Sequence, residues 1–89
     1  MRVRVRVYGS VQGVGFRYFV REVALSSQLR GWVRNLRDGS VEALFDGPDA
    51  EVKRALERCR KGPPLASVER FEVSPEEESE TLSGFDISS

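Results

Sequence analysis

The spacing of the apolar residues changes near the N-terminus, and this change constrains the fold more than any other feature of the sequence. Within residues 2–8 apolar side chains alternate with arginines, which predicts a strand with one buried face and arginines directed to solvent. From Phe16 the apolar positions follow helical spacing, which predicts an amphipathic helix that ends near residues 26–28. Residues 9–15 lie between the two patterns and contain three glycines, so we expect a loop there.

The rest of the chain continues to alternate between these two patterns. Asp38-Gly39 separates two strand-like runs and is a strong signal for a hairpin turn. A second helical stripe, which includes Cys59, lies between chain breaks at residues 46–49 and 61–64. The further strands are expected at 30–36, 41–46, 68–73 (with an irregularity between Val68 and Phe71) and 84–87, and an exposed, acidic loop at 74–83.

The order of these elements predicts an α+β fold with a single domain over residues 1–89. The order β-α-β-β-α-β is typical of the ferredoxin-like sandwich: one antiparallel sheet with two helices on one face, here with a short C-terminal edge strand. Right-handed crossovers make the strands at 2–8 and 30–36 parallel, with 41–46 between them. The loop at 9–15 and Asn35 then lie at the same end of the sheet, two strand spacings or roughly 10 Å apart.

Composition excludes several classes of function. The chain has no histidine and a single cysteine, Cys59, so neither a disulfide framework, a Cys/His zinc site nor a Ser–His or Cys–His catalytic pair can form. A formal net charge of zero argues against a general nucleic-acid or membrane-surface binder. The alternating N-terminus is unlike a signal peptide, and no segment approaches a membrane span, so we expect a cytoplasmic protein.

The glycine-rich loop is a candidate anion site because its backbone N–H groups and the following helix N-terminus can converge on one ligand. It matches neither the Walker nor the dinucleotide-binding pattern, and its glycines alone favour a plain turn. Arg17 changes this balance. It lies in the first turn of the helix, where a cation opposes the helix dipole at a cost of about 0.3–1 kcal/mol, and a bound anion would reverse the sign of that cost.

Two segments together resemble a known family. Gly9-Ser10-Val11-Gln12-Gly13-Val14-Gly15-Phe16-Arg17 resembles the first signature of the acylphosphatase family, although many members carry a basic residue at the position of Ser10. The segment Gly31-Trp32-Val33-Arg34-Asn35-Leu36-Arg37-Asp38-Gly39-Ser40-Val41-Glu42 resembles the second signature. The resemblance implies hydrolysis of acyl phosphates to a carboxylate and inorganic phosphate, without metal or cofactor.

The resemblance also implies roles for particular residues. Arg17 matches the phosphate-binding arginine of the family, and Asn35 matches the asparagine that orients the attacking water. Asn35 could instead cap its strand before the turn at Asp38-Gly39. The backbone of residues 11–16, which we call the cradle loop, matches the phosphate-binding loop of the family. The cradle loop consists of Val11, Gln12, Gly13, Val14, Gly15 and Phe16.

The absence of histidine is consistent with this chemistry, because a carboxylate leaving group needs no proton from the enzyme. We expect a monomer whose partners are a small acyl phosphate and the product phosphate. Two alternatives remain: an acylphosphatase-like domain used in carbamoyl transfer, and a non-catalytic module that binds RNA or a regulatory ligand. The zero net charge and the spacing of the aromatics after Gly15 argue against RNA. Tyr18 and Trp32 are candidates for a hydrophobic wall beside the acyl group.

Overall fold

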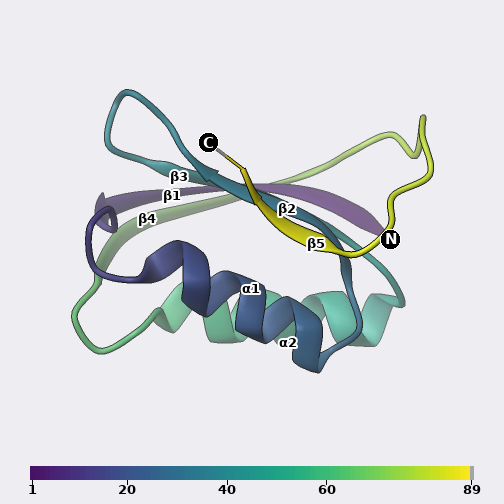
Figure 1. Ribbon diagram of the computed structural model, residues 1–89, viewed down its shortest axis with the longest axis horizontal. Coiled ribbons are helices and arrows are strands. Elements are labelled where there is room, and N and C mark those ends of the chain that lie inside the picture. The colour runs from purple at the N-terminus through teal and green to yellow at the C-terminus, as the bar shows by residue number, and fades with distance from the viewer. Residues whose placement is uncertain (89) are drawn as a thin grey trace.

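The computed structural model describes residues 1–88, and Ser89 lies outside them. Within those residues, five strands form one sheet, and two helices pack against one face of it (Figure 1). The elements are β1 (Arg2–Ser10), α1 (Phe16–Ser26), β2 (Arg30–Asn35), β3 (Val41–Asp46), α2 (Asp49–Lys61), β4 (Ser67–Pro75) and β5 (Phe85–Ser88). The predicted α+β order and the limits of the first helix are confirmed.

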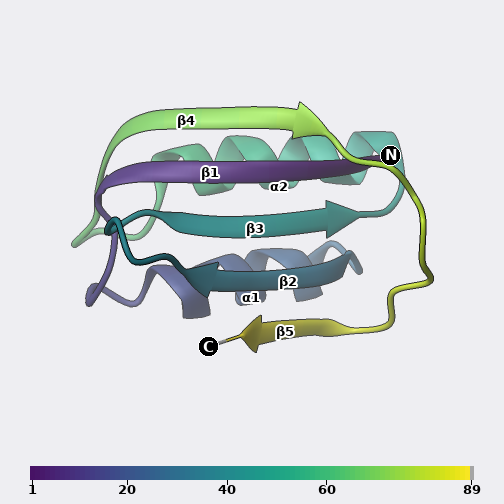
Figure 2. The ribbon, with the colours of Figure 1, turned by 90° about the horizontal axis from the view of Figure 1, so that it is seen from above.

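The central strands have the predicted arrangement. The strand order is β4-β1-β3-β2-β5, and β3 pairs antiparallel with both β1 and β2, so β1 and β2 run parallel on either side of it (Figure 2). The expectation of one antiparallel sheet is wrong at the last strand, because β5 pairs parallel with β2. Residues 76–84 carry the chain from one edge of the sheet to the other, so β5 enters from the end at which β2 begins.

The hydrophobic core lies between the sheet and the two helices. Alternate residues of β1 and β3 point into it, and their registers bring Val5 opposite Ala43 and Val7 opposite Val41. Phe16, at the start of α1, is 1% exposed and anchors the first turn of that helix against the core. Cys59 also belongs to the core, and burial raises the pKa of its thiol to about 12, which fits a structural role.

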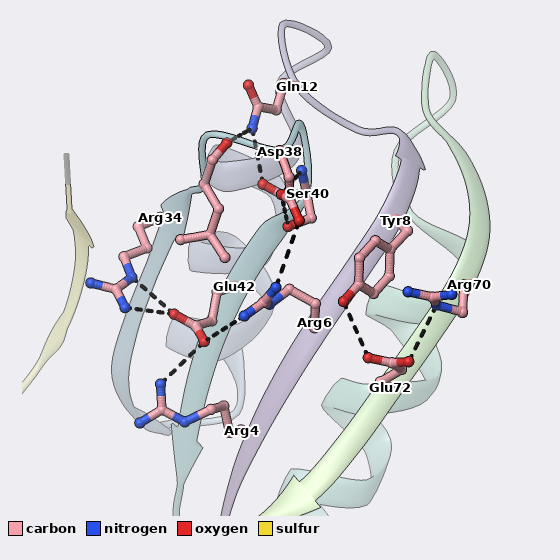
Figure 3. Close-up of polar contacts among 11 residues, drawn as sticks. Arg4, Arg6, Tyr8, Gln12, Arg34, Asp38, Ser40, Glu42, Arg70 and Glu72 are labelled. Carbon is pink, nitrogen blue, oxygen red and sulfur yellow. Dashed lines mark hydrogen bonds and ion pairs between the residues drawn. The ribbon is translucent and has the colours of Figure 1, made fainter.

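The arginines of β1 do not point freely into solvent, in contrast to the expectation from their alternation. They lie on the helix-free face of the sheet, where β3 presents carboxylates opposite them. Arg2 is 6% exposed and its Nε donates to Asp46 at 3.2 Å. Glu42 lies between three arginines of the two neighbouring strands (Arg4 and Arg6 of β1 and Arg34 of β2), as Figure 3 shows. Alternation identified the face correctly, but the pairing partners follow from strand register.

The segment 76–84 is mostly exposed, as its acidic composition predicted, but arginines of β1 hold it in place. Arg2 donates to the carbonyl oxygens of Glu77 and Glu80, at 3.4 and 2.8 Å, and Arg4 donates to the carboxylate of Glu76 at 2.8 Å. These hydrogen bonds hold the segment beside the start of β1. No helix among residues 1–88 is long and apolar enough to cross a membrane.

The predicted irregularity in the fourth strand is confirmed. Tyr8 pairs with Arg70, whereas Gly9 pairs with Val68, so the register shifts there and Glu69 is left without a partner residue on β1. The bulge bends the start of β4 at the end of the sheet where the cradle loop leaves β1.

Candidate active site

A cavity of about 170 Å³ lies at the end of the sheet where β1 and β2 both end. The β1–α1 loop, the first turn of α1 and the last residue of β2 form its walls. The lining residues are Val11, Gly13, Gly15, Phe16, Arg17, Tyr18 and Asn35. The fold thus brings both predicted catalytic residues, Arg17 and Asn35, to one cavity together with most of the predicted cradle loop.

The cradle loop has the backbone conformation that an anion site requires. Gly13 and Gly15 have φ values of 75° and 77°, in the left-handed region that glycine adopts without strain. Gly15 caps α1, and within the described part of the chain no side chain caps the N-terminal N–H groups of that helix. The first N–H groups of a helix have no partner within it, so here they remain available to a ligand in the cavity.

Arg17 is a half-buried cation at the positive end of a helix. No acidic residue lies in the first turn of α1. Within residues 1–88, no carboxylate lies within ion-pair distance of the Arg17 guanidinium, in contrast to the paired arginines of the sheet such as Arg2 and Arg34. Since no partner for this guanidinium lies among residues 1–88, it is a candidate for binding an anionic ligand, which would also compensate the helix dipole.

Asn35 supplies a buried polar atom whose partner is missing from the protein. Its Oδ1 is buried, and none of the groups in residues 1–88 donates a hydrogen bond to it. An unpartnered buried acceptor costs about 1–3 kcal/mol, so such an atom at a cavity wall points to a ligand or water as its partner. The interpretation of Asn35 as a strand cap is not supported, because its side chain makes no hydrogen bond to the neighbouring turn in the described chain.

Two residues of the predicted cradle loop do not line the cavity. Val14 packs against the core. The Gln12 side chain lies outside the cavity, and its Nε2 donates to the carbonyl oxygens of Leu36 and Ser40 in the β2–β3 turn (Figure 3). This contact could not be predicted from the residue types, because both acceptors are backbone atoms.

The two aromatic candidates differ in position. Tyr18 lines the cavity and is 67% exposed. Trp32 lies on the helix-free face of the sheet, where Arg34 and Arg4 stack over its ring at 4.8 and 5.5 Å. Only Tyr18 of these two can contact a ligand in the cavity.

The chemistry of the lining is that of positioning and charge stabilisation. Among the described residues, the lining contains one cation and one amide side chain, with no carboxylate or thiol. Such a site can hold an anion and order a water molecule, but it offers no general base with a pKa near neutrality. No group of three or more Asp, Glu or Cys side chains in residues 1–88 is arranged to hold a metal ion.

The fold and the site together define an α+β domain in which a glycine-rich loop, the N-terminus of α1, Arg17 and Asn35 meet at one cavity. The family model for acylphosphatase matches residues 3–87, and the chain belongs to that family.

Individual relatives agree with this assignment. The acylphosphatase of Moorella thermoacetica is 54% identical over 77 residues, which are 86% of this chain and 83% of the relative. The crystal structure of acylphosphatase from Bacillus subtilis superposes with a TM-score of 0.95 at 39% identity, over 99% of this chain and 98% of that one. The structure of HypF from T. kodakarensis matches with a TM-score of 0.88 at 34% identity, over the whole of this chain but 12% of that one.

Proposed function

We propose that this chain is an acylphosphatase in which the cradle loop and Arg17 hold the phosphoryl group of an acyl phosphate and Asn35 positions the attacking water. The oxygen of that water forms a bond to phosphorus while the bond from phosphorus to the carboxyl oxygen breaks. The products are a carboxylate, which leaves with the bonding electron pair, and inorganic phosphate, which retains the oxygen of the water. The remaining proton passes to phosphate or solvent.

The observation that carries this proposal is the unpartnered Oδ1 of Asn35 in the cavity that Arg17 also lines. An amide oxygen accepts a hydrogen bond from water and so fixes its position without removing its proton. Arg17 and the loop N–H groups have a different task, because they bind the phosphoryl oxygens and stabilise their negative charge. Phosphoryl transfer to water with a good leaving group needs little beyond these two contributions.

The test is release of phosphate from a simple acyl phosphate by the purified chain and its Arg17→Ala variant. We expect a loss of turnover of at least about 10²–10³-fold, because a preorganised charged donor is removed. Inorganic phosphate should also lose its effect as a competitive inhibitor. Arg21→Ala is the matched control: Arg21 lies one helical turn further along α1 and donates to the Phe85 carbonyl oxygen at 3.1 Å. Normal turnover in Arg17→Ala would contradict the assignment.

The same assay distinguishes the second candidate. The match to one segment of HypF shows that domains similar to this one occur within much longer proteins, and the role in carbamoyl transfer that the sequence resemblance left open is the second candidate. That role predicts a strong preference for carbamoyl phosphate, whereas a general acylphosphatase also turns over other acyl phosphates.

Independence from metal, the monomeric state and the cytoplasmic location remain predictions. Metal independence is tested by repeating the assay with a chelator, which should leave the rate unchanged.

A further inference from the structure

The side chain of Gln12 joins the two halves of the site. Its Nε2 donates to Leu36 O at 2.7 Å and to Ser40 O at 2.9 Å, so both hydrogens of the amide group are used (Figure 3). Both neighbours are acceptors, which fixes the orientation of the amide. Gln12 is exposed, so it contributes these hydrogen bonds and not core packing.

The two accepting carbonyls lie directly beside Asn35. Leu36 follows it in the chain, and Ser40 precedes Val41, which is the register partner of Asn35. Leu36 N donates to Ser40 O at 2.9 Å, so the two acceptors of Gln12 are themselves joined at the base of the turn. Asp38 stiffens the same turn, because its carboxylate accepts hydrogen bonds from the backbone N–H and hydroxyl of Ser40.

The sheet itself does not join these two halves. The cradle loop follows β1 and Asn35 ends β2, but β3 separates β1 from β2. Within residues 1–88, the two bonds from Gln12 are the hydrogen bonds that connect the cradle loop with the turn at 36–40. Core packing of Val11 and Phe16 anchors both ends of the cradle loop, and Gln12 adds the hydrogen bonds that tie the loop to the segment beside Asn35.

We infer that Gln12 is a positioning residue: its amide holds the phosphate cradle at a fixed distance from Asn35 and so aligns water with phosphorus. This role rests on the proposed function. It differs from the role of the Gln12 backbone in the cradle loop, because it acts through the side chain on a different element. Alignment of a nucleophile matters at the transition state, so loss of the contact should lower kcat and leave phosphate binding nearly unchanged.

The experiment compares Gln12→Met, which keeps the length and removes both donors, with Gln12→Lys, which can still donate to both carbonyls. For Gln12→Met we expect kcat to fall by about 10–100-fold, the range for small misplacements of reacting groups, with the inhibition constant of inorganic phosphate changed less than about three-fold. Gln12→Lys should retain kcat within about three-fold of the parent. Amide hydrogen exchange at Leu36, whose N–H donates to Ser40, should accelerate only in Gln12→Met.

Arg21→Met is the control, because it also removes a side-chain donor from a backbone carbonyl, but at the end of the sheet remote from the site. It should leave kcat unchanged, even if its melting temperature falls. The inference is overturned by an unchanged kcat in Gln12→Met, by an equal loss in Gln12→Lys, or by an equal loss in Arg21→Met. Failure of the proposed function is a separate result, because it appears as normal turnover in Arg17→Ala.

Discussion

At the scale of single residues, the site is built from groups left without partners. The sheet arginines have carboxylates opposite them, whereas Arg17 has none among the described residues. Asn35 likewise keeps a buried oxygen unsatisfied. Such groups lower stability until a ligand binds, so their presence together in one cavity is better explained by binding than by folding.

Replacement of Asn35 by Ala tests the role of its oxygen. We expect kcat to fall by about 10²–10³-fold, the typical loss for a preorganised polar group at a reacting centre, while KM and phosphate inhibition change little. The melting temperature should hardly fall, because no group among residues 1–88 donates a hydrogen bond to the buried Oδ1. Measuring kcat, phosphate inhibition and melting on one preparation checks this. A lowered melting temperature with unchanged kcat would remove Asn35 from the mechanism.

At the scale of elements, β3 links the charged side chains of its two neighbouring strands on the helix-free face of the sheet. Its Glu42 is 4% exposed and lies within 3.2 Å of Arg4, 3.7 Å of Arg6 and 2.7 Å of Arg34, which belong to β1 and β2. Desolvation opposes ionisation of this carboxyl, but hydrogen bonds from Arg34 and Arg4 outweigh it and lower its pKa. One carboxylate therefore balances cations from both neighbouring strands.

Glu42→Gln should destabilise the fold by about 1–3 kcal/mol, because it leaves three partly buried arginines without their shared partner. Glu72→Gln is the matched control: its carboxylate is 53% exposed and pairs with Arg70 at 3.2 Å, so we expect a loss below about 1 kcal/mol. Urea unfolding of both variants measures the difference. Equal losses in the free energy of unfolding would show that Glu42 is not the group that links the strands. Turnover per folded molecule should be unchanged in both variants.

The elements illustrate what the sequence could predict. Period-two and helical spacing located the strands and both helices, because apolar periodicity follows directly from which face is buried. The position of the cradle loop could be predicted from its glycines and from Arg17 in the first turn of the following helix. The parallel addition of β5 and the pairing of Arg2 with Asp46 could not be predicted, because both depend on contacts between residues far apart in sequence. The Gln12 contacts were missed because they end on backbone carbonyls.

At the scale of the whole molecule, stability between about pH 3 and 8 should depend on pH only at the acid end. The pKa of Asp38 is lowered chiefly by the Ser40 hydroxyl, that of Glu76 chiefly by a hydrogen bond from Arg4, and that of Glu42 by its arginines. Unfolding returns these groups to ordinary values of 3.8 for Asp and 4.5 for Glu, so the unfolded chain binds more protons in acid. Their stabilisation is present above about pH 5 and is lost as the pH falls below 4.5.

Thermal unfolding between pH 3 and 8 measures this dependence. Between about pH 5 and 8 the melting temperature should be flat, because the chain has no histidine. Below that range the melting temperature should fall, and less steeply in Glu42→Gln, which has one fewer perturbed carboxyl. A titration step centred near neutrality would contradict the assignment of these groups.

The strap of residues 76–84 and the helix α2 give a chain of zero net charge an electrical polarity. The strap carries four glutamates at the end of the sheet remote from the cradle loop. Helix α2 repeats this asymmetry, with acidic residues in its first turn and basic residues in its last turn (Asp49 and Glu51, then Arg58, Arg60 and Lys61). Because the basic end of α2 and Arg17 lie toward the cradle, we expect an anionic substrate in dilute salt to meet less repulsion there than at the strap, and added salt should weaken this difference.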